Sequence, residues 1–237
     1  MLELLMIGRK KATGGGIPAD LGPGPASMLG YYERPDGGNS GYFGTFTNFV
    51  STAGLCQSIG LTAGYQQTEN ATWHKFLLDG KILFIPTNYI VRNLHWNYIY
   101  NAGAVYGDDS FGVYQSPTPT AQSAKHVTVD GRVYRVRLVS ISNSDPALTG
   151  QIDKTTEWGR LMYPIDPTVD ASNTEAGKKW GNVGLLLSST QILAKETYAS
   201  TPASSLVVVT NSTTRSAQSK STAPSNCTWR PILELVQ

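Results

Sequence analysis

The clearest hydrophobic and polar pattern in the chain is that of a β-hairpin at residues 73–86. Two mostly apolar runs, 73–78 and 81–86, are separated by the dipeptide Asp79-Gly80. A tight turn between antiparallel strands needs residues that tolerate a positive φ, and Asp-Gly is among the best sequences for it. Pro86 has no N–H to donate, so we expect it to end the second strand.

A second hairpin is predicted at residues 126–139, again around an Asp-Gly pair, at 130–131. Side chains alternate between the two faces of a strand, so the return strand has one mostly apolar face that we assign to the core. Arg135 and Arg137 lie on the other face, where we expect a small, solvated basic patch. The core face carries Arg132, Tyr134, Val136 and Leu138.

A short helix is predicted at residues 93–102, directly after the first hairpin. Leu94, Tyr98 and Ala102 recur at intervals of four, which places them on one helix face. Asn93 is suited to cap the first turn. This face is expected to pack on the hairpin.

Two further helices are predicted from their end signals. Residues 49–59 have Thr47 or Asn48 as the expected cap, and Gly60 as the residue that ends the helix. A third helix is expected to begin at residues 155–157, where two threonines precede a glutamate.

The C-terminal part of the chain predicts strands. Residues 206–209 form an apolar β-branched run, and residues 229–236 alternate as one terminal strand. Trp229 and Arg230 are assigned to the core, with Arg230 in an ion pair with Glu157. With 24 glycines and 13 prolines, the composition favours an α+β fold of mainly antiparallel β-sheet with two or three short helices and long loops.

The N-terminal region differs from the rest of the chain. Residues 1–12 contain a short apolar run that is costly to leave in water, so we predict a peptide that docks on a neighbouring subunit; a frayed end or an edge strand is the alternative. Residues 13–41 are rich in glycine and proline and are predicted to be a linker, followed by one globular domain at residues 42–237. The docking side chains are Leu2, Leu4, Leu5 and Ile7.

Charge and cysteine content exclude several classes of function. Charged residues make up 15% of the 237, and the net charge is +2, which gives no electrostatic reason to expect nucleic acid as a partner. No apolar run approaches the length of a membrane span, so no membrane partner is expected. Cys56 and Cys227 are predicted to be separate buried thiols, and a disulfide between them is the alternative in an oxidising compartment.

No catalytic residue pattern is evident. His74, His95 and His126 lie in three separate elements without the spacing of metal ligands. Nucleophile elbows and phosphate-binding loops are absent from the sequence. We therefore predict that the protein is not an enzyme and uses no cofactor or metal.

The turn at residues 106–109, Tyr-Gly-Asp-Asp, has the same four letters as the metal-binding turn of RNA-dependent polymerases. Such a short match arises easily by chance, and we interpret it as a solvated turn. Whether Asp108 and Asp109 bind an ion such as Ca²⁺ stays open. A glycan-degrading enzyme, the alternative from another class, would need two carboxylates in one groove; the candidates are Asp108, Asp109, Glu157 and Asp166.

Several segments together resemble a recurring domain of tailed-bacteriophage virion proteins of the tail-fibre type. They are DGKILFIP (79–86), HWNYIYNAGAVYG (95–107), the second hairpin (127–139), EWGRLMY (157–163) and WRPILEL (229–235), and they occur in the family's order. The resemblance covers about residues 41–237. The closing W-R-P strand after a long polar region also resembles C-type-lectin-like and formylglycine-enzyme-like domains.

The resemblance implies a structural component of a tailed-phage virion, assembled in the host bacterial cytoplasm. A tail-fibre, baseplate or neck (collar) appendage is the first choice, and a capsid decoration or head-fibre protein is the alternative. Other virion structural proteins would be its partners, and a homo-oligomer is expected.

An exposed appendage could also bind a host surface glycan. The polar loops between residues 188 and 227 are the expected outer surface, because hydroxyl and amide groups suit hydrogen bonding to sugars. Their contact with neighbouring subunits or with water alone is the alternative. The residues predicted to face such a ligand are Tyr198, Asn211 and Arg215.

Overall fold

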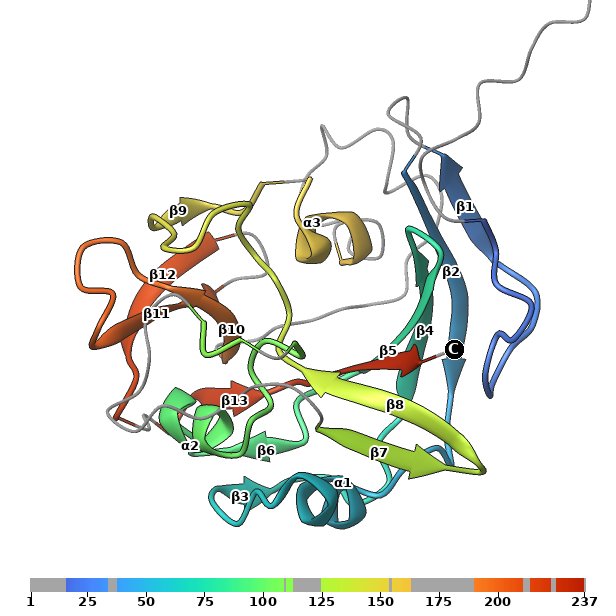
Figure 1. Ribbon diagram of the computed structural model, residues 1–237, viewed down its shortest axis with the longest axis horizontal. Coiled ribbons are helices and arrows are strands. Elements are labelled where there is room, and N and C mark those ends of the chain that lie inside the picture. The colour runs from blue at the N-terminus through green and yellow to red at the C-terminus, as the bar shows by residue number, and fades with distance from the viewer. Residues whose placement is uncertain are drawn as a thin grey trace, which may run out of the picture.

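The computed structural model describes residues 16–33, 38–108, 110–112, 125–153, 155–162, 190–210, 214–222 and 225–236. Strands hold 41% of these residues and helices 11%, and most strand pairs are antiparallel, so the predicted α+β class is confirmed. The strands form two seven-stranded sheets, which Figure 1 shows side by side, with β1 and β2 on the right and β10, β11 and β12 on the left.

The first sheet is built around the two predicted hairpins, and every neighbouring pair in it is antiparallel. Both hairpin turns have the expected positive φ, 49° and 80° at Asp79 and Gly80, and 49° and 76° at Asp130 and Gly131. The C-terminal strand lies between the hairpins and joins them into one sheet. The order is β1 (Gly30–Glu33), β2 (Asn39–Phe46), β4 (Trp73–Leu78), β5 (Lys81–Pro86), β14 (Ile232–Val236), β8 (Arg132–Arg137) and β7 (His126–Val129).

The second sheet is made of shorter strands from the middle and the end of the chain. Its single parallel pair is β10 with β13, and its other pairs are antiparallel. The predicted strand at residues 206–209 is present as part of β11. The order is β3 (Tyr65–Gln66), β6 (Val91–Arg92), β13 (Cys227–Trp229), β10 (Gln191–Thr197), β11 (Ser205–Thr210), β12 (Thr214–Ser219) and β9 (Gly150–Gln151).

The predicted terminal strand at residues 229–236 is wrong as a single element. Trp229 ends β13 in the second sheet, and Ile232 begins β14 in the first sheet. Between them, Pro231 cannot donate a ladder hydrogen bond, so the strand is interrupted there and the chain crosses from one sheet to the other.

Two of the three helices begin and end largely as their signals predict. α1 (Thr52–Ile59) ends at Gly60, which has the left-handed φ of 73°; its N-cap is Ser51, however, and not Thr47 or Asn48. The Ser51 hydroxyl accepts a hydrogen bond from the backbone N–H of Gly54 at 3.0 Å. In α3 (Glu157–Leu161) the predicted threonine cap is Thr156.

The remaining helix, α2 (Trp96–Asn101), begins later than predicted. Its N-cap is His95, and Asn93 instead has a positive φ of 54° before the helix. Leu94 and Ala102 are buried as expected, but Tyr98 is 45% exposed. The predicted face was therefore wrong at its centre; the helix buries Trp96, Ile99 and Tyr100.

Both faces of the first hairpin are buried, each in its own hydrophobic cluster. One face contributes Trp73, Leu77 and Phe84 to the larger cluster. The other face contributes Phe76 and Leu83 to the smaller one. This explains why β4 and β5 are almost continuously apolar instead of alternating.

The described part of the predicted linker, residues 13–41, is packed on the first sheet, which corrects that prediction. β1 lies within it and pairs with β2. Lys75, fully buried in β4, donates a hydrogen bond to the Pro25 carbonyl at 2.7 Å. Gly24 has a φ of 77°, and a Cβ there would lie 2.7 Å from the Phe46 ring. The glycines and prolines here permit close packing; they do not indicate a free linker.

Candidate functional site

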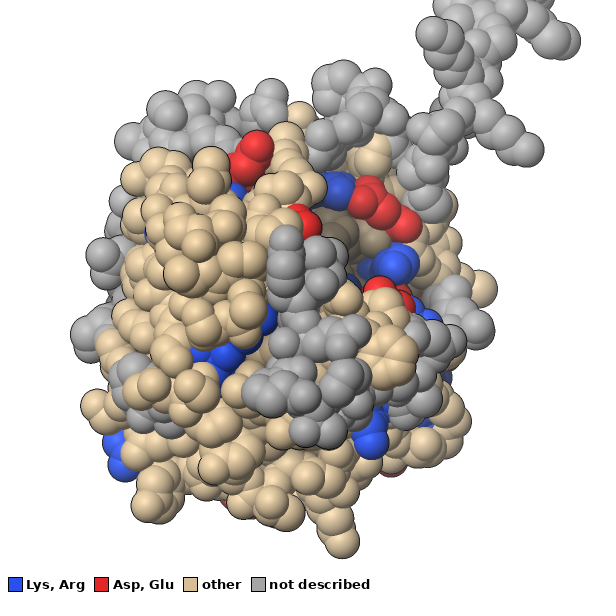
Figure 2. All heavy atoms as spheres, turned by 60° about the vertical axis from the view of Figure 1, so that its left-hand side comes forward, with Lys and Arg blue, Asp and Glu red and all other residues tan. Residues whose placement is uncertain are grey.

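An open hollow of about 330 Å³ is lined by charged side chains from both sheets and from α3. On the face drawn in Figure 2 charged side chains are sparse, and several of both signs gather around a recess. We call this cavity the Arg137 hollow. Its lining residues are Lys81, Tyr106, Gly107, Asp108, Arg135, Arg137, Ser140, Glu157, Lys195 and Glu234.

Arg137, the last residue of β8, is held between two glutamates. Its Nη2 and Nη1 donate to Glu157 Oε1 and Oε2 at 2.7 and 2.9 Å, a bidentate pair. Its Nε donates to Glu234 Oε2 at 3.1 Å. The three side chains are only 8–12% exposed. The prediction of a solvated patch was therefore wrong for Arg137, because Glu157 of α3 lies against this face of β8 and Glu234 of the neighbouring strand β14 pairs with Arg137 on the same face.

Two cations at the rim of the hollow also lie close to the Glu234 carboxylate. Lys81 Nζ lies 3.2 Å and Arg135 Nη1 3.6 Å from Glu234 Oε1. Burial alone would raise the pKa of Glu234, but Arg137 and Lys81 together lower it below the usual value. The lone glutamate of β14 is thus a shared partner for three cations.

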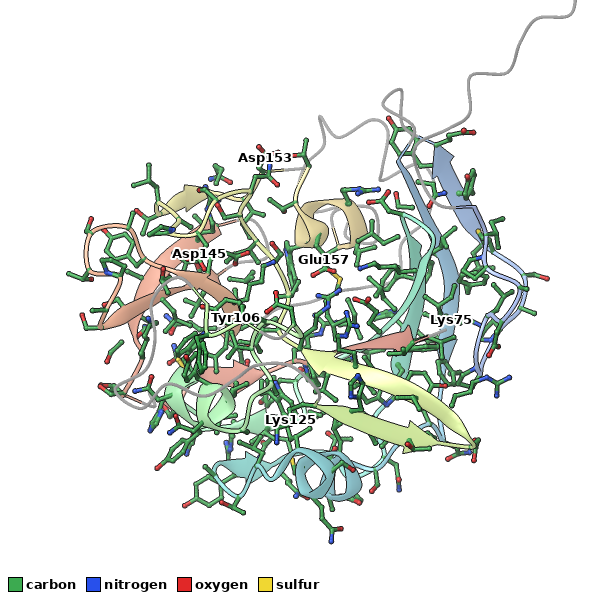
Figure 3. All side chains as sticks on the ribbon, in the orientation of Figure 1. Lys75, Tyr106, Lys125, Asp145, Asp153 and Glu157 are labelled. Atoms are coloured by element: carbon green, nitrogen blue, oxygen red, sulfur yellow. The ribbon has the colours of Figure 1, made fainter. Side chains whose placement is uncertain are left out.

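Glu157 uses both of its oxygens in the same cluster. Besides Arg137, it accepts a hydrogen bond from the backbone N–H of Ser140 at 3.0 Å. Burial opposes ionisation here, yet Arg137 and the Ser140 amide lower the pKa of Glu157. Figure 3 shows the Glu157 side chain on the inner side of α3, toward the middle of the molecule. The carboxylate is therefore charged and fully engaged.

A third glutamate, Glu196, accepts a hydrogen bond from Ser140. Ser140 Oγ donates to Glu196 Oε1 at 2.6 Å, and the Ile141 N–H donates to Glu196 Oε2 at 3.2 Å. Glu196 lies in β10 and is 1% exposed. Burial raises its pKa to about 7, despite these hydrogen bonds. Ser140 thus links one charged carboxyl, from α3, and one readily protonated carboxyl, from β10.

The structure brings together two of the carboxylates that a glycan-degrading enzyme would need. Asp108 and Glu157 line the same hollow, while Asp109 and Asp166 lie outside the described residues. Asp108 Oδ1 accepts a hydrogen bond from the Ser110 N–H at 3.0 Å, in a local turn. A general acid must hold a proton near neutral pH, and the lowered pKa of Glu157 does not suit that role. The geometry is that of a cluster in which side chains of opposite charge pair with one another.

Two of the three residues predicted to face a glycan, Tyr198 and Arg215, lie within the described residues. Tyr198 is half-buried and packs against the smaller hydrophobic cluster. Arg215 is also half-buried, and its Nη1 donates to the Ile141 carbonyl at 3.3 Å. Asn211 lies outside the described residues, as do Leu2, Leu4, Leu5 and Ile7 of the predicted docking peptide.

The remaining candidate groups, His74, Cys56 and Cys227, are buried in the fold. His74 is buried next to the Tyr42 hydroxyl, 3.0 Å from its Nδ1. Burial and the charge of Arg230 lower the pKa of His74 to about 3. Cys56 and Cys227 are free and buried, as predicted, and burial raises the pKa of each thiol to about 11. Among the described residues, no three His, Cys, Asp or Glu side chains are placed to hold a metal ion.

Arg230 corrects a further prediction. It is 1% exposed, so its assignment to the core is confirmed. Its partners are the carbonyls of Pro86 and Thr87, at 2.6 and 3.0 Å, and Glu157 instead pairs with Arg137. The buried arginine therefore caps the end of β5 and takes no part in an ion pair with the third helix.

The sequence did contain one sign of this cluster, which does not depend on the spacing of hydrophobic residues. Glu196 and Glu234 are single acidic residues inside otherwise buried strands, and such residues are rarely fully buried without a partner. That signal indicates partners somewhere in the chain, without identifying them.

A comparison with protein-family models, curated protein sequences and solved structures found no match to this chain. Among the residues described, none of the helices is long and apolar enough to cross a membrane.

Proposed function

We propose that this protein is a structural component of a tailed-bacteriophage virion, in first place a tail-fibre, baseplate or neck appendage. The observation that carries the proposal is that the segments on which the phage resemblance rests, far apart in sequence, contact one another through specific side chains. These segments therefore belong to one packed unit, which supports reading them together.

The first contact joins the DGKILFIP and EWGRLMY segments. Arg160 Nη2 donates to Asp79 Oδ1 at 2.7 Å, and Arg160 Nη1 also pairs with Asp79. The same Nη2 donates to the Asn39 carbonyl at 2.8 Å. One arginine of α3 thus holds the turn of the first hairpin and the start of β2. Planar, bidentate recognition of this kind is specific to arginine.

Two more contacts involve the closing WRPILEL segment. Glu234 pairs with Lys81 of DGKILFIP and with Arg137 of the second hairpin. Arg230 Nε donates to the Pro86 carbonyl, and its guanidinium lies 5.9 Å from the centre of the Trp158 ring. The closing segment therefore contacts three of the other segments, through Glu234 in β14 and through Arg230 at the crossing from β13 to β14.

A rigid unit of this kind suits a particle subunit, because its surface can pack without first becoming ordered. Under this proposal residues 1–12 dock on a neighbouring virion protein, and the folded domain forms homo-oligomers on the particle. A capsid decoration or head-fibre protein is the alternative position, and a C-type-lectin-like relationship stays a prediction.

Mass spectrometry of purified particles tests the proposal. Virions are taken from a lysate of the strain that encodes the chain, and the protein is quantified relative to the major capsid protein in particles and in the unfractionated lysate. We expect co-purification at a small fraction of the capsid protein; near-equal amounts would favour the decoration alternative. Presence in the lysate together with absence from intact particles would overturn the structural role.

A further inference from the structure

A second hollow lies at the C-terminal ends of α1 and α2, two helices in the lower part of Figure 1. It measures about 180 Å³, and the segment after α1 and the last turn of α2 line it. We call it the Tyr98 hollow. In contrast to the Arg137 hollow, none of the described residues that line it is charged.

The wall formed by α2 carries an aromatic ring that is held on one side. The Tyr98 ring stacks on the His95 imidazole, with 3.8 Å between ring centroids and an interplanar angle of 17°. Burial lowers the pKa of His95, which keeps the imidazole neutral near pH 7. The stack covers one face of the Tyr98 ring, while 45% of the residue stays exposed. A flat apolar surface therefore borders the hollow.

Polar groups complete the hollow. Gly60 is the C-cap of α1 and Ala102 is the C-cap of α2, so both helices end here. The carbonyls of the last turns already accept hydrogen bonds from the N–H groups that follow each helix, as those of Cys56 and Tyr98 do from Leu61 and Ala102. The polar groups of the hollow are therefore side chains: Thr62, in the segment after α1, and Asn101, in α2, both line it and are exposed.

The aromatic wall is already rigid, because the rest of α2 is anchored in the core. Trp96 and Tyr100 are fully buried and stack on each other at 4.9 Å. Lys220 directly follows β12, and its Nζ lies 4.6 Å from the centre of the Trp96 ring. A ligand would thus not have to order this surface on binding.

We propose that the Tyr98 hollow binds one neutral pyranose ring of a surface glycan. The apolar face of the sugar would stack on Tyr98, and its hydroxyls would bond to the side chains of Thr62 and Asn101. The volume is below that of sites for drug-sized molecules, which fits a single ring. The inference rests on the proposed function in one respect: it names the ligand class that an exposed virion appendage would contact.

Titration of the full chain with methyl glycosides of glucose, galactose, mannose and N-acetylglucosamine, followed by saturation-transfer NMR, tests this site. For one of them we expect a dissociation constant on the order of 1–10 mM, as for any ligand of one ring. Tyr98→Ala should weaken binding about tenfold or more, and Tyr98→Phe by no more than about threefold, because it keeps the stacking ring. Tyr31→Ala removes an equally exposed tyrosine, in β1, and serves as the matched control.

Two outcomes would overturn the inference: no binding of any of the four glycosides well above the expected concentration, or equal binding by Tyr98→Ala and the unchanged protein. Thermal melting of each variant separates loss of the ring from loss of the fold. The outcome is independent of the particle experiment, since sugar binding by a protein absent from virions would leave this site standing and remove only its proposed setting.

Discussion

The two hollows of this protein use their side chains in opposite ways. In the Arg137 hollow, a buried arginine and two buried glutamates satisfy one another, and the rim cations join them. In the Tyr98 hollow the lining is neutral, and its largest side chain is 45% exposed. Groups that already have partners contribute to the fold, whereas groups left open at a rigid surface are available to a ligand. A change in the first should therefore alter stability, and a change in the second should alter binding.

The largest effect is expected from Glu157→Gln. The change leaves Arg137 buried with one carboxylate in place of two and puts an amide N–H₂ against a guanidinium or the Ser140 N–H. Removing one partner of a buried ion pair costs about 3–5 kcal/mol. The free energy of unfolding, from urea denaturation at pH 7, measures it.

Glu33→Gln is the matched control for that experiment. Glu33 lies exposed in β1, so the same chemical change there should leave the unfolding curve unchanged. A loss below about 1 kcal/mol for Glu157→Gln would mean that the cluster gives no net stabilisation.

A smaller effect, visible only as a pH dependence, is expected at Glu196. Its folded-state pKa of about 7 lies above the ordinary value of 4.5. Between these values the folded protein holds a proton that the unfolded chain has released. The stabilisation is therefore complete below pH 4.5 and is lost as the pH rises through 7. The difference should be on the order of 3 kcal/mol across this range.

Comparison with Glu196→Gln isolates this contribution. Ser140 Oγ can accept from the new amide while it donates to the Ser142 carbonyl, 3.2 Å away, so the variant keeps its hydrogen bonds. His74 acts in the opposite sense, because its lowered pKa removes stability as the pH falls below 6.5. Unfolding free energies of both proteins at pH 4.5–8 should diverge as the pH rises to about 7 and then run parallel. Parallel curves would show that Glu196 titrates normally.

Much of the fold was predictable because its signals are local. The two Asp-Gly turns, the Gly60 helix end and the Thr156 cap each depend on residues within a few positions. The order of the strands in the sheets, in contrast, is not set by residues within a few positions. The break at Pro231 could be suspected from the missing N–H, but the transfer of the chain to another sheet depends on pairing with β5 and β8, far away in sequence.

The sites were harder to predict, for the same reason. Alternation places Arg137 on the face opposite Tyr134 and Val136, as found, but whether that face meets water depends on other elements. Glu157 is 20 residues away and Glu234 is 97. For Tyr98 the helical spacing was correct and the helix start was not. α2 begins at Trp96 and buries Trp96, Ile99 and Tyr100, and at 3.6 residues per turn Tyr98 falls on the opposite side of the helix.

The smallest effect on stability is expected from Tyr98→Ala, which completes the comparison. Tyr98 is largely exposed, and the stack on His95 is its main contact, while alanine is the better helix former. The free energy of unfolding should change by less than about 1 kcal/mol. Tyr100→Ala, two residues away, should cost about 3–5 kcal/mol, because that ring is fully buried and its hydroxyl donates to the Phe111 carbonyl at 2.8 Å. If both variants lost comparable stability, Tyr98 would belong to the core, and the contrast between the two hollows would fail.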